Sequence, residues 1–250
     1  MSKIDDYRQA LTAVSDWDAY LLINSNLPGP RGNLELAHAA ADLADAALLH
    51  RYRQIDARQA PVNTPHEFLA FVGVLGLGRL ISEGAANLDD LRPFAADGRW
   101  RVREAVAMAL QRVGMADLPG LLVALEDWAR GTPWEQRAAA AGLCEPALLR
   151  RPDEVTAVLH LLDAITATIP AQTDRRADAF QALRKGLAYC WSVAIAANPT
   201  AGKPLLEKWL ASADKDVRWI MRENLKKKRL ERMDAAWVAR CLLSEESDGL

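Results

Sequence analysis

The chain of 250 residues holds few groupings of side chains that could ligate a metal or attack a substrate. Its histidines never stand three or four residues from one another or from a cysteine, so the sequence has no helical pair of metal ligands. Its three cysteines form no CxxC motif, which argues against a cysteine zinc site and a disulfide framework. These residues are His38, His50, His66, His160, Cys144, Cys190 and Cys241. We expect neither a bound metal nor a cofactor.

Two motifs that look functional are better explained by packing. The glycine-rich run 73–78 lacks the third glycine of a dinucleotide fingerprint and follows no strand, so we expect the glycines to allow close helix packing. Cys144 has no histidine near it in sequence, although one could approach it in space. We expect Cys144 to be a free cysteine of the core.

Positive charge gathers in the C-terminal quarter. Residues 203–240 hold 11 Lys and Arg against 6 Asp and Glu, a net +5, whereas the whole chain carries −2. Four of these cations would form one continuous stripe on a helix, at offsets of four, four and three, with Trp219 beside its start. They are Arg218, Arg222, Lys226 and Arg229. Such a stripe could hold a nucleic-acid backbone, and the alternative is a solvated face balanced by Glu223 and Glu231.

The elements that must position these residues are helices. Apolar residues recur at helical spacing in 100–113 and again in the alanine-rich stretch 34–48, and no convincing run alternates as a strand would. Prolines and glycines divide the chain into roughly eleven or twelve helices joined by loops of ordinary length. Half of the residues are hydrophobic, enough for a large core. The sequence therefore predicts an all-α protein.

The apolar spacing also repeats along the chain. One copy is Leu91, Phe94, Val102 and Leu110, with successive offsets of 3, 8 and 8. A second is Leu206, Trp209, Val217 and Leu225, and a third, with deviant Gln and Cys, is Leu125, Trp128, Gln136 and Cys144. Each copy predicts a short helix, a turn and a second helix. Because one helical hairpin cannot bury both of its apolar faces, such units stack.

This pattern resembles HEAT-like repeats over about residues 88–230. In that family an Asp precedes the second helix and an Arg follows its first buried Val, as in Asp97 with Arg103 and Asp214 with Arg218. The resemblance implies an α-solenoid. Residues 1–87 hold no clear copy, so we expect them to form capping helices, and residues 231–250 a C-terminal helix and tail. No linker with a shift in composition separates these parts, so we expect a single domain, 1–250. Arg103, Arg137 and Arg218 then recur at one position of the repeat. They either line a groove that grips phosphates or tie neighbouring hairpins together by pairing with the Asp.

Within this class, RWRVREAVAMAL (99–110) and DVRWIMRENLKK (216–227) look like the second-helix signatures of the AlkC/AlkD-type alkylpurine DNA glycosylases. The resemblance implies that Glu104 is the catalytic carboxylate, with Trp100 and Trp191 or Trp219 as aromatic walls around a cationic base. A carboxylate and tryptophan faces would stabilise that charge as the base leaves. The third signature departs from the family, because Ala141 stands where its acid is expected.

The favoured function is therefore binding without catalysis, through a concave groove that takes duplex DNA or a protein partner. An alkylpurine DNA glycosylase and a protein–protein scaffold are the alternatives. The acidic N-terminus and the short apolar run 68–78 predict neither a signal peptide nor a membrane span, and we expect a cytoplasmic protein.

Overall fold

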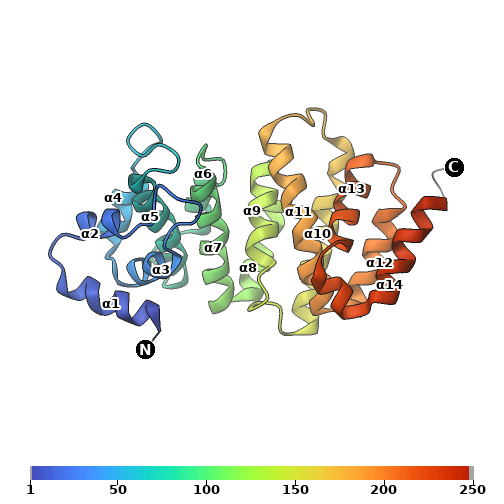
Figure 1. The fold of residues 1–250 in the computed structure, drawn as a ribbon, viewed down its shortest axis with the longest axis horizontal. Helices are drawn as coiled ribbons and strands as arrows, with labels where there is room; N and C mark the ends of the chain where they lie inside the picture. The colour runs from blue at the N-terminus through green and yellow to red at the C-terminus, as the bar shows by residue number, and fades with distance from the viewer. Residues whose placement is uncertain (1, 248–250) are drawn as a thin grey trace. The chain divides into compact units, whose positions relative to one another are not determined.

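The protein is helical throughout the residues that its structure, a computed structural model, describes, namely 2–247. These residues form fourteen α-helices and two short 3₁₀ helices, and no strand is found among them (Figure 1). The predicted all-α class is thus confirmed. The chain divides into two compact units, unit 1 (residues 1–117) and unit 2 (residues 118–250), whereas the sequence suggested a single domain with a cap ending at residue 87.

Unit 1 is built around α5 (Pro65–Ser82), which packs against four other helices of the unit and is buried on nearly all sides. Thr64 and Pro65 begin this helix, and the proline suits the first turn because its missing N–H would have no partner there. The other elements are α1 (Lys3–Ala13), α2 (Trp17–Ile23), α3 (Leu34–Leu43), α4 (Ala46–Arg53), η1 (Leu88–Leu91), α6 (Arg92–Ala95) and α7 (Trp100–Ala116). Because α5 packs against α7, the unit is continuous across residue 87.

The glycines of α5 allow its neighbours to approach closely. A Cβ on Gly73 would lie 2.8 Å from Tyr52 Cβ of α4, and one on Gly78 would lie 2.5 Å from the Ala109 carbonyl oxygen of α7. Any side chain at these positions would force the helices apart. The expected packing role of the glycine-rich run is confirmed.

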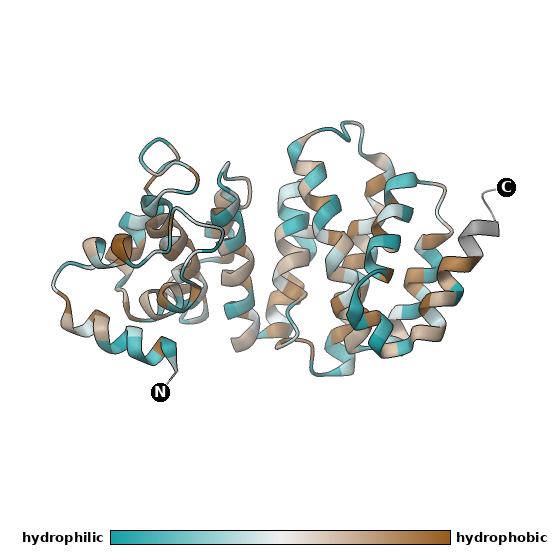
Figure 2. Ribbon diagram, in the orientation of Figure 1, coloured by the Kyte–Doolittle hydropathy of each residue, from teal (hydrophilic) through white to brown (hydrophobic). Residues whose placement is uncertain are grey.

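Unit 2 contains three successive helical hairpins. The helices are α8 (Leu118–Arg130), α9 (Pro133–Leu143), α10 (Pro152–Ala167), α11 (Asp178–Ala197), α12 (Pro199–Leu210) and α13 (Lys215–Leu225), with η2 (Ile169–Ala171) after α10 and α14 (Lys228–Ser247) at the end. The first helices of the hairpins pack side by side, α10 contacting both α8 and α12. The second helices do the same, α11 contacting both α9 and α13. Unit 2 therefore has two layers, and hydrophobic positions alternate with hydrophilic ones along its helices (Figure 2).

The side-chain amide of Asn224 joins α13 to α11 inside unit 2. It accepts a hydrogen bond from the Ser192 N–H at 2.8 Å and donates to the carbonyl oxygens of Leu187 at 2.9 Å and Ile220 at 2.8 Å. Asn224 is fully buried, so these bonds satisfy polar atoms that water does not reach.

One stretch, Pro152–Ala171, is long and apolar enough to cross a membrane by length and composition, with a mean hydropathy of 1.2. It comprises α10 and η2, and α10 contacts α8, α9, α11 and α12. Its buried residues include Val155, Leu159, Leu162 and Ile165, each at 0% exposure. The hydrophobicity of this helix is thus used in packing the core of unit 2.

Candidate functional site

A cavity of about 260 Å³ in unit 1 brings together the two residues of the predicted catalytic pair. Trp100 and Glu104, one turn apart in α7, both line it, together with Phe68 and Phe71 of α5 and the loop before α3. Their offset of four places the side chains on one side of the helix. The cavity thus presents an exposed indole and a carboxylate to the same space.

Arg101 forms the inner part of this cavity and is itself anchored. Its guanidinium lies 4.4 Å from the centroid of the Trp100 ring and donates hydrogen bonds to Glu67 at 3.1 Å and to the Gly29 carbonyl at 2.7 Å. Glu67 is fully buried and also accepts the Asn63 N–H at 2.7 Å. The ion pair thus attaches two loops of unit 1 to α5 and α7, and Arg101 supports the face of the tryptophan ring.

Arg99, which precedes Trp100 in sequence, is also buried. It donates to both carboxylate oxygens of Asp97 and to the Ile55 carbonyl at 2.9 Å. Burial alone would raise the pKa of Asp97, but the hydrogen bonds from Arg99 outweigh burial and lower it. Trp100 is therefore an exposed residue between two arginines whose side chains are fixed.

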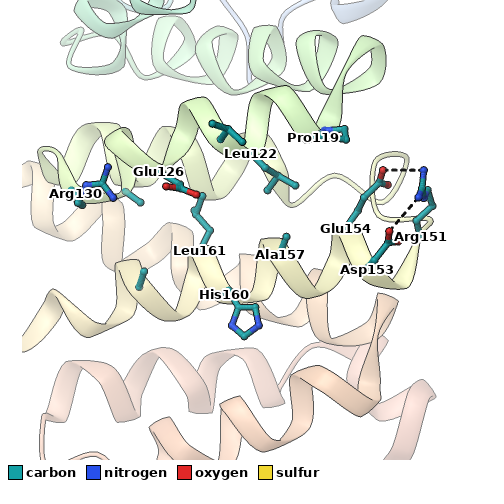
Figure 3. Close-up of a pocket in the computed structure, with 13 residues that line it drawn as sticks. Pro119, Leu122, Glu126, Arg130, Arg151, Asp153, Glu154, Ala157, His160 and Leu161 are labelled. Carbon is teal, nitrogen blue, oxygen red and sulfur yellow. Dashed lines mark hydrogen bonds and ion pairs between the residues drawn. The ribbon is translucent and has the colours of Figure 1, made fainter.

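The larger cavity, of about 670 Å³, is a groove between α8 and α10 in unit 2 (Figure 3). Apolar side chains from the two helices line its length, and Glu126 and Leu161 point into the space between them. At one end Arg151 pairs with Asp153 at 3.2 Å and with Glu154 at 3.7 Å. Val123, 71% exposed, adds an open apolar side chain to this groove.

Two cations approach an exposed tyrosine of α11. Tyr189 of α11 is 48% exposed, and the guanidinium of Arg229 lies 4.8 Å from its ring centroid while donating a hydrogen bond to its hydroxyl. Lys227 Nζ lies 6.0 Å from the same centroid. We define the Tyr189 basic face as Tyr189, the two cations that contact it, and three exposed cations on or next to α11 and α13. Its residues are Lys185, Tyr189, Arg222, Lys226, Lys227 and Arg229.

The predicted basic stripe is only partly present as one helix face. Helix α13 ends at Leu225 with Lys226 as its C-cap, so Arg229 lies on α14 rather than on the helix of Arg218 and Arg222. The expectation of one continuous helical stripe is corrected accordingly. Arg222 and Lys226 are exposed, and Lys226 pairs with Glu223 at 2.5 Å. Arg229 donates a hydrogen bond to the Tyr189 hydroxyl, so this cation lies beside α11 although it belongs to α14.

The recurrent arginines of the repeat have local structural partners. Arg103 donates to the carbonyl of Asp97, and Arg218 donates to the carbonyl of Ser212 at 2.6 Å, in each case six residues earlier. Both therefore bind the turn before the second helix through a backbone oxygen, whereas the sequence suggested the Asp carboxylate. Arg137 packs against α11, since a Cβ on Gly186 would lie 3.4 Å from its Cγ.

The two remaining tryptophans of the predicted site lie inside unit 2. Trp191 is fully buried, and its Nε1 donates to Thr166 Oγ1 at 3.1 Å, so this residue belongs to the core rather than to a binding surface. Trp219 is half-buried under the guanidinium of Arg184, which lies 3.6 Å from its ring centroid. Neither lines the cavity of Trp100 and Glu104.

Sequence reasoning missed Glu67, Arg101 and Tyr189. Glu67 directly precedes the apolar run 68–78, and an acid next to such a run is a signal for a buried partner. Arg101 had no local partner in sequence, because its carboxylate lies 34 residues away. Tyr189 gave no signal in sequence, since the two cations that contact its ring, Lys227 and Arg229, lie about 40 residues away in the chain. Among the described residues no three His, Cys, Asp or Glu side chains are grouped to hold a metal ion.

Comparison with known proteins does not assign this chain to a family. No protein-family model matches the chain, and no curated protein matches it. A structural match is the crystal structure of an engineered protein from the Northeast Structural Genomics Consortium, at 17% identity and a TM-score of 0.35, covering 93% of this chain and 98% of that one. A similarity at this level carries no argument about fold or function.

Proposed function

We propose that this protein binds nucleic acid through the Tyr189 basic face, without catalysis, and that its hairpins are HEAT-like repeats. The observation that carries the proposal is the approach of two cations, Lys227 and Arg229, to the exposed ring of Tyr189 on α11. Exposed cations that lie near them in the chain add to this charge, namely Lys185, Arg222 and Lys226. Val217, Ile220 and Met221 occupy the buried side of α13, so its charged side is left for solvent or a ligand. Such a surface suits a phosphate backbone.

The repeat interpretation rests on equivalent residues in the copies. Val102, Gln136 and Val217 are all buried near the start of a second helix, as the offsets predict. Gln136, the deviant residue, donates its amide to the Ala129 carbonyl at 3.0 Å, which explains how a polar side chain is accommodated there. Arg103 and Arg218 make the same contact six residues back. We therefore propose that the all-α fold is a stack of HEAT-like repeats. We also propose that the protein works in the cytoplasm.

The test is binding of duplex DNA at several salt concentrations. We expect retention at low salt and a steep loss as salt rises, because phosphate contacts release counterions. Reversing charge in Arg222→Glu/Lys226→Glu should weaken binding about tenfold or more and reduce the salt slope by about two. The matched control, Arg58→Glu/Arg150→Glu, changes the same charge at exposed residues that are not part of the Tyr189 basic face.

Lack of retention by the wild-type protein at low salt would overturn the proposal. A protein–protein scaffold would then be the leading alternative, with the groove between α8 and α10 as its candidate surface. An equal effect of the control variant would show that net charge, rather than this face, governs binding.

A second candidate, an alkylpurine DNA glycosylase, is favoured by one specific observation: Trp100 and Glu104 line the same cavity. An anionic carboxylate beside an indole would stabilise a cationic base and the charge that forms as it leaves. Against it, Ala141 stands where the resemblance requires an acid. Binding without catalysis therefore remains the first candidate.

Release of N3- or N7-methylpurine from alkylated DNA decides between the two. Our proposal predicts no release by the wild-type protein. If release occurs, Glu104→Gln should lower its rate on the order of a hundredfold, since the loss of one stabilising group costs several kcal/mol of barrier. Glu126→Gln, an exposed carboxylate of unit 2, is the matched control.

A further inference from the structure

The exposure of Tyr189 is unusual for an aromatic residue of this protein. Among the aromatic residues whose side chains the structure describes, only Tyr189 and Trp100 are exposed, at 48% and 43%. Tyr189 lies among hydrophobic neighbours in sequence, since Ala188 and Cys190 are both buried. Its ring is thus placed outside the core although its chain neighbours are within it.

The ring is also held in position. Arg229 contacts it twice, through its guanidinium at 4.8 Å from the centroid and through a hydrogen bond to the hydroxyl. A ring fixed at two points loses little conformational freedom when a ligand stacks on it. Arginine on one side of the ring also adds a planar cation beside a stacked group.

Further cations lie close to the ring or near it in the chain. Lys227 approaches the ring at 6.0 Å, Lys185 precedes Tyr189 by one helical turn, and Lys226 follows the end of α13. An exposed aromatic ring among cations on an open surface is the arrangement that single-stranded nucleic acids use, because each unpaired base offers a flat face.

A duplex cannot use this ring in the same way. Its bases are stacked and paired inside the helix, so reaching an aromatic ring requires a base to flip into a pocket. Neither of the two cavities described above includes Tyr189. The ring lies on an open surface, where a duplex would contribute only its backbone.

We infer that Tyr189 is a stacking site for an unpaired base, so that the nucleic acid taken by the Tyr189 basic face is single-stranded. This inference rests on the proposed function and narrows it to one class of ligand. Duplex DNA then binds by charge alone, and a single strand binds by charge and stacking together.

The experiment measures fluorescence anisotropy of a labelled 12-nucleotide oligo-dT and of a 12-base-pair duplex at matched salt. We expect the wild-type protein to bind the single strand more tightly than the duplex. Tyr189→Ala should weaken single-strand binding about five- to a hundredfold and leave its salt slope unchanged, because no charge is lost. Tyr189→Phe, which keeps the ring, should retain most of the affinity.

Two controls separate stacking from damage to the fold. Circular dichroism should show the same helical content for both variants and the wild type. Ile23→Ala removes a side chain of unit 1 that is 81% exposed and should change neither affinity. Loss of affinity in Tyr189→Phe equal to that in Tyr189→Ala would assign the effect to the hydroxyl and overturn stacking.

The outcomes also distinguish this inference from the proposed function. If duplex binds as tightly as the single strand and Tyr189→Ala changes neither, the stacking site is wrong while nucleic-acid binding stands. If neither oligonucleotide binds at low salt, both proposals are overturned.

Discussion

Arg101 and Glu67 form an ion pair, 3.1 Å long, in which the arginine side chain is 5% exposed and the carboxylate is inaccessible. Glu67 Oε1 and Arg101 Nε have no hydrogen-bond partner among the described residues. Burying this pair therefore carries a desolvation cost. The hydrogen bonds from the Asn63 N–H to Glu67 and from Arg101 to the Gly29 carbonyl offset that cost.

Removing one partner of this pair should destabilise unit 1 strongly. In Glu67→Gln the guanidinium of Arg101 is left buried without an opposing charge, which costs about 3–5 kcal/mol. Urea unfolding followed by circular dichroism measures the change. The exposed pair Arg151 and Asp153 provides the comparison, and Arg151→Gln should cost less than about 1 kcal/mol. Equal effects of the two variants would contradict the assigned role of burial.

Asn224 should tolerate no close substitute. In Asn224→Asp the carboxylate cannot donate to the carbonyls of Leu187 and Ile220, and a charge is buried at the contact between α11 and α13. We expect a loss of about 3 kcal/mol or more in the free energy of unfolding. The exposed Gln9→Glu, an equivalent amide-to-acid change on α1, should stay within about 0.5 kcal/mol. A small effect of Asn224→Asp would show that the two helices are held by apolar packing alone.

The stability of unit 1 should depend on pH through His38. Burial lowers the pKa of its imidazole from the ordinary 6.5, and the nearby Arg112 lowers it further, against opposing effects of Asp42 and Glu35. The unfolded chain then binds a proton at His38 more readily than the folded chain does. The contribution of neutral His38 to stability is therefore fully present above pH 6.5, the pKa in the unfolded chain, and is lost as the pH falls through the lower pKa in the folded protein. Urea midpoints measured downward from pH 6.5 should fall less steeply in His38→Gln. Parallel curves for variant and wild type would remove His38 from this role.

The cysteines should react only when the fold opens. Cys144, Cys190 and Cys241 are free and buried. Burial raises the pKa of the Cys144 thiol well above its ordinary value, and hydrogen bonding with Cys190 adds to this effect, so little thiolate is available. A chromogenic disulfide reagent should label the native protein slowly and the denatured protein quickly at all three sites. Rapid labelling of Cys144 in the native state would contradict this and indicate a reactive, nucleophilic thiol.

The sequence predicts the helices well because their signals are local. Apolar spacing places Val102, Gln136 and Val217 inside, and all three are buried. The first turn of α5 follows from Thr64 and Pro65 in the same way. These features depend on residues within one or two turns of each other.

The failures come from partners that are distant in sequence. Nothing near Trp191 reveals that Thr166 will receive its indole N–H inside unit 2. The end of α13 at Leu225 is hidden because Lys226, Lys227 and Lys228 are good helix formers, with no glycine or proline to mark the break. The candidate site shows the same division. The offset of four predicts that Trp100 and Glu104 share a side, whereas the buried support from Arg101 and Glu67 becomes visible only in the fold.

The position of Trp100 between two anchored arginines gives the protein an optical reporter. Of its eight tryptophans, only Trp100 is exposed, and the other seven are buried or half-buried. A neutral soluble quencher such as acrylamide therefore reaches Trp100 first. Because its neighbours hold it still, a change in its emission reports on what occupies the adjacent cavity of unit 1, without a label and without altering the chain.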